Sequence, residues 1–255
     1  MPDAVALYRT LLAAADDGSV AIAAIGFATN LAALLKSPPD STSPLNGTAL
    51  VARKVRIVTW QGGWYASRHP AADLAKRKPE DEFNWGCGRR WFAPIAGCEG
   101  TAAYAVGHMP TSVEQIFSEV GFLMPTGDTL MQCAESRHPC RAALAATKRA
   151  WHQDPSGGRA SWDAMVTLMA VRGPEGVRGS KGGVGGTNVV DQGGTNHWRV
   201  GSNPAASKHS YLVLDGDRAD WPESVFAAQA PVTPALTEMR DEINRLLCRP
   251  PKGAE

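Results

Sequence analysis

Two polar side chains in the first half of the chain have the types and spacing of a hydroxyl-binding pair. Glu82 and Asn84 flank Phe83, and alternate residues of an extended segment lie on the same face. A carboxylate accepts hydrogen bonds and an amide both donates and accepts, so the pair suits the neighbouring hydroxyls of a sugar. The simpler alternative is two surface polar residues beside a core phenylalanine.

A second candidate group lies at a predicted helix start, at Trp162 and Asp163. An indole can stack on a planar ring, and a carboxylate can hold a hard cation. A buried core tryptophan and a first-turn aspartate favoured by the helix dipole would explain the same two residues. Both interpretations stay open, because any one of eight tryptophans is weak support.

The elements that must position these residues follow an alternating order. Apolar runs at 20–25 and 55–60 lack alternation, which is typical of strands covered on both faces. The order strand, helix, strand predicts an α/β fold with an open, mostly parallel (mixed) sheet wrapped by helices. No linker divides the sequence, so residues 1–255 are predicted to form one domain. Further helices and strands are expected at 5–15, 31–35, 139–151, 163–171, 233–247, 113–117 and 209–214.

Several segments, in chain order, resemble the inosine–uridine-preferring, calcium-dependent nucleoside hydrolase family. The match covers most of residues 3–213 and rests on G-x-x-T-N-L-A at 26–32, a strand ending in Gln61-Gly62-Gly63 where the family has M-G-G, E-F-N at 82–84, Ser161-Trp162-Asp163, Asn196-His197-Trp198 and Tyr211-Leu212. The resemblance implies a Rossmann-like nucleoside hydrolase fold. It also implies cleavage of the N-glycosidic bond of nucleosides to ribose and free base.

The resemblance also implies roles for individual residues. A Ca²⁺ ion would bind the ribose hydroxyls and the attacking water, with the Thr29 carbonyl and Asp163 among its ligands. Glu82 and Asn84 would grip the ribose. Trp162 stands where many members carry a histidine, and its stacking would favour purine bases. A helix-starting Thr-Asn cap is an equally good explanation of Thr29.

The sequence departs from the family at its beginning. Members open with D-x-D-x-x-x-D-D, whose aspartates hold the ion and supply the general base; this chain lacks the motif, so no catalytic residue is assigned. The nearest imitations, at 215–220 and at Asp16-Asp17, are predicted to be exposed turns. Two ligands would bind calcium poorly. We therefore expect a sheet without the family's first central strand, in either a truncated enzyme or an inactive relative that binds a nucleoside or sugar.

Composition limits the partners and the compartment. A net charge of +1 gives no support for nucleic-acid or membrane-surface binding, so a small-molecule nucleoside is the expected partner, with a homo-oligomer left open. The N-terminus lacks the features of a signal peptide, which favours the cytoplasm. The five cysteines are accordingly predicted to be free or buried thiols, with a Cys87–Cys98 or Cys133–Cys140 disulfide as the alternative. The glycine-rich stretch 173–194 is predicted to be loop, and two GGTN copies, at 185–188 and 193–196, are too few for a solenoid.

Overall fold

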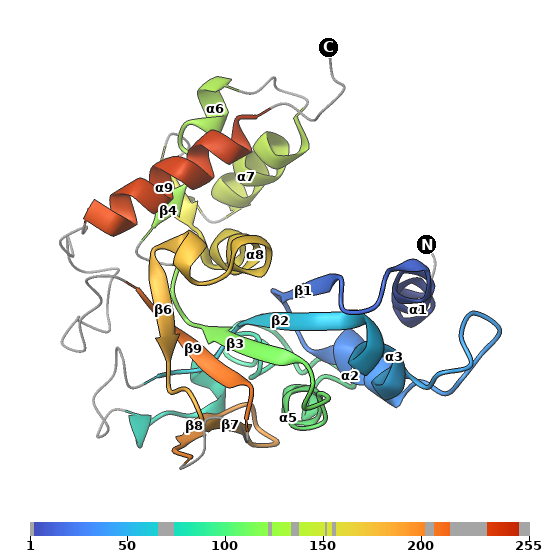
Figure 1. Cartoon of the computed structure of the whole chain (residues 1–255). Helices are drawn as coiled ribbons and strands as arrows, with labels where there is room; N and C mark the ends of the chain where they lie inside the picture. Colours follow the sequence, from blue (N-terminus) through green and yellow to red (C-terminus); the bar gives the residue numbers. More distant parts are fainter. Residues whose placement is uncertain are drawn as a thin grey trace.

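A five-stranded sheet with the order β1-β2-β3-β9-β6 forms the centre of the molecule (Figure 1). Strands β1 (Val20–Ala24), β2 (Val55–Gln61), β3 (Glu114–Ser118) and β9 (His209–Leu214) are parallel, and β6 (Gly179–Gly182) is antiparallel to β9. The predicted α/β class with a mixed, mostly parallel sheet is therefore confirmed. This computed structural model describes residues 3–65, 74–121, 124–133, 138–150, 152–154, 157–201, 207–214 and 234–249.

Helices cover both faces of the sheet, as the unalternating apolar strands predict. Helices α2 (Thr29–Lys36), α3 (Gly47–Lys54) and α5 (Thr101–Gly107) lie on one side of β2, and α8 (Trp162–Arg172) lies on the other (Figure 1). Side chains alternate along β2, so Val58 and Trp60 join the first core cluster and Ile57 joins the second. Helix α1 (Ala4–Ala14) packs against α2 and α3.

The remaining elements extend this framework. Helices α6 (Leu130–Cys133), α7 (Pro139–Ala150) and α9 (Pro234–Leu247) gather beyond α8 in Figure 1, and β4 (Pro125–Thr126) pairs with β5 (Arg159–Ala160). The α7, α8 and α9 helices agree with the predicted helical periodicity. Within the described residues, no helix is long and apolar enough to cross a lipid bilayer.

The prediction that residues 173–194 are loop is wrong. This stretch contains β6 and β7 (Thr187–Val190), and β7 forms a hairpin with β8 (Asn196–Arg199). Glycine is needed here for close packing rather than for flexibility. A Cβ atom on Gly186 would lie 2.2 Å from Nε1 of Trp198, and one on Gly182 would lie 2.4 Å from the ring of Tyr211.

The prediction that the cysteines are all thiols is also wrong for four of the five. Cys87 pairs with Cys98, which agrees with one of the alternatives, and Cys133 pairs with Cys248 rather than with Cys140. Cys140 is a free, exposed thiol. The second bridge joins residues 115 positions apart and ties the end of α9 to α6. Sequence spacing could not indicate this pairing.

The structure tests the exposed-turn prediction for only one of the two acidic segments that imitate the family's opening motif. Asp16 and Asp17 are exposed after α1, as predicted, and Asp17 forms ion pairs with Arg53 and Lys54 at 2.8 Å. Residues 215–220 lie outside the described residues. The assignment to the nucleoside hydrolase fold, the missing central strand and the single domain stay predictions.

Candidate functional site

The loops that follow β1, β2 and β3 meet at one edge of the sheet. These strands are parallel, so their carboxyl ends share this edge, where ligands bind in open α/β sheets. The main-chain N–H of Gly62 donates to the carbonyl of Ser118 at 2.9 Å. The main-chain N–H of Tyr65 donates to Oε1 of Glu119 at 3.1 Å. Both contacts join the end of β2 to the end of β3, and the carboxyl edge is therefore the candidate site.

The loop that carries Glu82 and Asn84 packs over the end of β2. Nδ2 of Asn84 donates a hydrogen bond to the main-chain carbonyl of Gln61 at 2.9 Å. The ring of Trp85 covers the following glycines so closely that a Cβ atom on Gly62 would lie 2.6 Å from it. Residues larger than glycine would therefore displace the loop. The ring of Phe83 stacks on Phe27 from the turn after β1, with centroids 5.7 Å apart.

Glu82 has an unusual electrostatic environment. The residue is only 8% exposed, and its carboxylate accepts the main-chain N–H of Trp85 within its own turn. Burial raises the pKa of Glu82 to about 7, although main-chain N–H groups of Trp85, Asn84, Gly86 and Gly63 act in the opposite direction. Near neutral pH the carboxyl group therefore exists in both protonation states, as a general acid or base requires.

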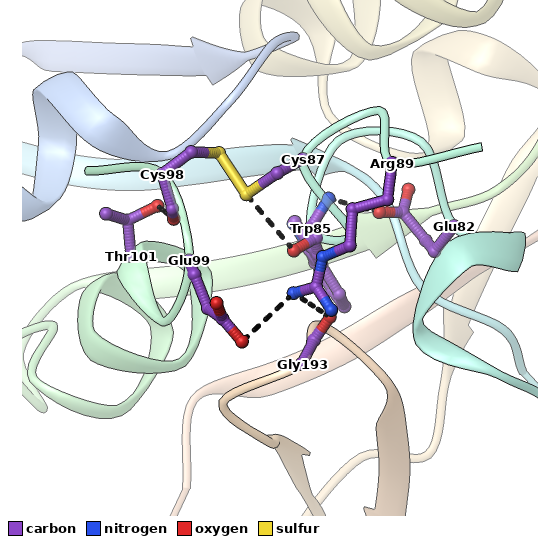
Figure 2. The surroundings of a disulfide bond; sticks show 8 residues. All are labelled: Glu82, Trp85, Cys87, Arg89, Cys98, Glu99, Thr101 and Gly193. Atoms are coloured by element: carbon purple, nitrogen blue, oxygen red, sulfur yellow. Dashed lines mark hydrogen bonds and ion pairs between the residues drawn. A yellow bond between two sulfur atoms is a disulfide. The ribbon is translucent and has the colours of Figure 1, made fainter. Parts of the chain in front are cut away.

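A disulfide and a hairpin tip hold this loop from the other side (Figure 2). The Cys87–Cys98 bridge closes the loop of residues 87–98, which contains Arg89 and ends just before Gly100. Arg89 Nη2 donates to the carbonyl of Gly193 at 3.2 Å, and the N–H of Gly100 donates to the carbonyl of Gln192 at 3.1 Å. Hydrogen bonds from Arg89 inside the disulfide loop and from Gly100 just after it therefore hold the tip of the β7–β8 hairpin.

The asparagines of the two GGTN copies hydrogen-bond to each other across the same hairpin. Nδ2 of Asn196 donates to Oδ1 of Asn188 at 2.9 Å, and Nδ2 of Asn188 donates to the hydroxyl of Tyr65 at 3.2 Å. Oδ1 of Asn196 accepts the main-chain N–H of Trp64 at 2.8 Å. The repeated motif thus supplies a buried polar network that fixes the segment after β2. The repeat was visible in the sequence, but its role depends on the hairpin pairing.

Helix α8 brings Trp162 and Asp163 to the carboxyl edge. Arg56, near the start of β2, donates to the carbonyl of Ala170, and Thr59 Oγ1 donates to the carbonyl of Val166 at 3.1 Å. Helix α8 therefore runs antiparallel to β2, and its first turn lies where β2 ends. Trp162 is half-buried and Asp163 is exposed. Partial burial of its carboxyl raises the pKa of Asp163, whereas Arg159 acts in the opposite direction.

Thr29 reaches the same edge as the first residue of α2, which follows β1. It is half-buried, and Ala28, the preceding residue, makes no side-chain cap. In an α-helix the carbonyl groups point toward the C-terminus and the N–H groups of the first turn point outward. The start of α2 therefore presents hydrogen-bond donors to the edge. The role of the Thr29 carbonyl as a metal ligand stays a prediction.

The fold thus brings the five sequence-predicted residues to loops and helix starts on one edge. Their side chains nevertheless face different surroundings. The extended segment predicted for Glu82 and Asn84 is wrong, because residues 82–90 form a bend and turns in which the N–H of Gly86 donates to the carbonyl of Glu82 at 3.2 Å. Both residues are buried. Asp163 is exposed, and no hydrogen bond links it to Glu82 in the part of the chain that the structure describes.

Comparison with known proteins adds no name to this geometry. Neither a scan against protein-family models nor a search of curated proteins found a match to the chain. The resemblance to nucleoside hydrolases therefore rests on the motifs quoted above.

The residues at the edge do not by themselves fit a calcium ion. Calcium takes six to eight oxygen ligands, and the sequence-predicted set consists of the Asp163 carboxylate and the Thr29 carbonyl. Among the described residues, no group of three or more acidic, histidine or cysteine side chains could hold a metal.

A separate cavity of about 280 Å³ lies at the opposite edge, between α5, β7 and the start of β9. None of the sequence-predicted residues lines it. His209 does, and burial lowers its pKa to about 4. Its two ring nitrogens face the main-chain N–H of Asn188 at 3.1 Å and Nε2 of Gln115 at 2.8 Å. Nδ1 accepts the N–H of Asn188, and the lowered pKa leaves this imidazole neutral near neutral pH.

Proposed function

We propose that the carboxyl edge is a nucleoside-binding site of the N-ribohydrolase type. The strongest support is that the predicted site residues come together in the fold. The first and last of the five predicted residues are 134 positions apart in the sequence, yet their segments meet at the edge where α/β sheets bind ligands. The five are Thr29, Glu82, Asn84, Trp162 and Asp163.

The chemistry of the edge suits a sugar joined to a flat base. Helix starts at Thr29 and Trp162 offer main-chain N–H donors, and Asp163 offers an exposed acceptor. A hydroxyl group can use both, because it donates and accepts. The half-buried indole of Trp162 leaves part of its surface for stacking on a base, most favourably a purine.

Cleavage of the N-glycosidic bond is the further step that the resemblance implies. It requires an activated water and a group that assists the leaving base. Glu82, with its pKa of about 7, is the described carboxyl group best poised for proton transfer. Binding without turnover is the second candidate function, because the predicted ligand set of Asp163 and the Thr29 carbonyl is too small to hold calcium well.

Titration calorimetry separates these functions. Inosine, adenosine, uridine and free ribose are each titrated into the full chain, with calcium and with a chelator. Binding of a nucleoside that Trp162→Ala weakens by about tenfold, the scale of one lost stacking contact, supports the proposed site. Lack of heat with every nucleoside, in both buffers, contradicts it.

Release of free base is measured in parallel by chromatography. We expect nucleoside binding without measurable calcium-dependent release, because the predicted ligand set is too small for calcium. Turnover that Asp163→Ala abolishes would instead establish the hydrolase and make Asp163 part of its site. Turnover that persists in a chelator and is lost in Glu82→Gln would point to Glu82 as the proton-transfer group.

The cysteines bear on the cellular location. The cytoplasmic expectation rested on the N-terminus and implied reduced thiols, but four cysteines form two disulfides. Stable disulfides are typical of oxidising compartments. We therefore propose that the folded protein functions in an oxidising compartment, which cell fractionation followed by thiol labelling can test.

A further inference from the structure

The side chain of Gln61, the last residue of β2, has a buried hydrogen-bond acceptor that receives no hydrogen bond. The residue is 8% exposed, and its side-chain Oε1 makes no hydrogen bond. Its main-chain carbonyl, in contrast, accepts the amide of Asn84. An enclosed oxygen that has lost its hydration without gaining a donor weakens the fold, so such a group calls for an explanation.

Strand geometry directs this side chain toward the start of α8. Alternate side chains share a face, so Gln61 lies on the same face as Thr59, which contacts the carbonyl of Val166. Two strand residues span roughly 6.6 Å, and four helical residues rise about 6 Å. Because α8 runs antiparallel to β2, Gln61 lies level with Trp162, in the first helical turn.

The start of α8 lacks the usual side-chain cap. Ser161 occupies the N-cap position, but its hydroxyl bonds with the hydroxyl of Thr126 and makes no cap hydrogen bond. The first-turn N–H groups therefore receive no acceptor from this side chain. The uncapped first turn of α8, which carries Asp163, and the unpaired acceptor of Gln61 therefore lie at the same level of the fold.

We propose that Gln61 is a specificity-determining residue whose Oε1 accepts a hydrogen bond from a sugar hydroxyl of the bound nucleoside. This inference rests on the proposed function and names the group that the site selects. A hydroxyl can donate to Gln61 while it accepts from the helix N–H groups. A phosphate dianion at the same point has no hydrogen to donate and would meet two oxygens, from Gln61 and Asp163. The selected sugar is therefore unphosphorylated at this hydroxyl.

The enclosed position of Oε1 is compatible with this role. The last torsion of a glutamine side chain is broad, so its amide group rotates at small cost. Rotation toward an arriving hydroxyl exchanges an unpaired acceptor for a paired one. Binding of a ligand with this hydroxyl then gains the free energy of a hydrogen bond that Oε1 lacks in the empty site. A ligand without the hydroxyl gains none of this free energy.

The test compares Gln61→Met with a matched control, Ser210→Ala. Ser210 is 3% exposed, and its hydroxyl is likewise buried without a partner, but it lies near the amino end of β9, away from the candidate edge. Both substitutions remove an unpaired buried polar atom, so neither is expected to lower the melting temperature. Affinities for inosine and its 2′-, 3′- and 5′-deoxy analogues are measured by titration calorimetry.

We expect Gln61→Met to bind inosine roughly 10- to 100-fold more weakly than the wild type, and Ser210→Ala to bind it unchanged. One deoxy analogue should bind the wild type as weakly as Gln61→Met binds inosine, and should bind both proteins equally. If the wild type binds inosine and Gln61→Met binds it equally well, this inference is wrong and the proposed function stands.

Two further results complete the test. A wild type that binds every deoxy analogue as tightly as inosine recognises no sugar hydroxyl, which overturns the inference even if Gln61→Met fails to fold. A wild type that binds no nucleoside at all contradicts the proposed function, and this inference with it.

Discussion

The side-chain amide of Asn84 donates to the main-chain carbonyl of Gln61, 2.9 Å away, and thereby fastens a loop to the end of the central strand β2. The carbonyl belongs to the same residue whose side-chain oxygen is unpaired. A residue predicted to bind ligand thus also holds the wall of the candidate site, and its removal should affect stability as well as binding.

We expect Asn84→Ala to lower the free energy of unfolding by about 1–3 kcal/mol, because it leaves the buried carbonyl of Gln61 without a donor. Urea denaturation followed by tryptophan fluorescence measures the change. Asn30→Ala is the matched control, since Asn30 is exposed on α2 and should change stability by less than about 0.5 kcal/mol. Equal effects of the two substitutions would show that the Asn84 bond does not anchor the loop.

Glu82 should make stability depend on pH. Its folded-state pKa of about 7 lies above the ordinary value of 4.5, so the folded chain binds this proton more tightly than the unfolded chain. The contribution is fully present below about pH 4.5 and is lost as pH rises through about 7. Relative to Glu82→Gln, the wild type should lose on the order of 3 kcal/mol across this window. Denaturation curves between pH 4 and 8 test this, and a difference that does not change with pH would contradict it.

Gly62 should tolerate no side chain. A Cβ atom there would lie 2.6 Å from the ring of Trp85, and the ring is buried and cannot move aside freely. We expect Gly62→Ala to cost about 1–3 kcal/mol of stability through overpacking. Gly26→Ala is the control, because a Cβ atom on Gly26 meets nothing within 4 Å. Comparable melting temperatures for the two variants would mean that Trp85 is not packed against this glycine.

Thiol chemistry should distinguish Cys140 from the other four cysteines. Under denaturing, non-reducing conditions, iodoacetamide is expected to label Cys140 alone, and peptide mapping should recover Cys87 linked to Cys98 and Cys133 linked to Cys248. Cys140→Ser should remove all labelling before reduction. A peptide that links Cys133 to Cys140 would disprove the pairing. Substitution of both Cys133 and Cys248 by serine should cost roughly 2–4 kcal/mol.

The parts of the fold that depend on local pattern were predictable from the sequence. The apolar runs that form β1 and β2 showed that both faces would be covered, and helical periodicity located α7, α8 and α9. The candidate site was predictable only in part. A helix start placed Asp163 in a first turn, as observed, whereas the extended segment predicted for Glu82 and Asn84 is a series of turns.

Tertiary contacts decided what local pattern could not. The glycine-rich stretch at 173–194 forms strands because Tyr211 and Trp198 pack closely against its glycines, and neither partner is a neighbour in sequence. The Cys133–Cys248 pair depends on where α9 docks. The sequence also could not show that Glu82 and Asn84 are buried, since Trp85 packs over Gly62 only in the folded chain. The sequence by itself thus determined which residues form the parallel strands β1, β2, β3 and β9. Only the packing of distant segments determined which atoms are buried, paired or left without a partner, because burial and hydrogen bonding across the fold are properties of the assembled chain.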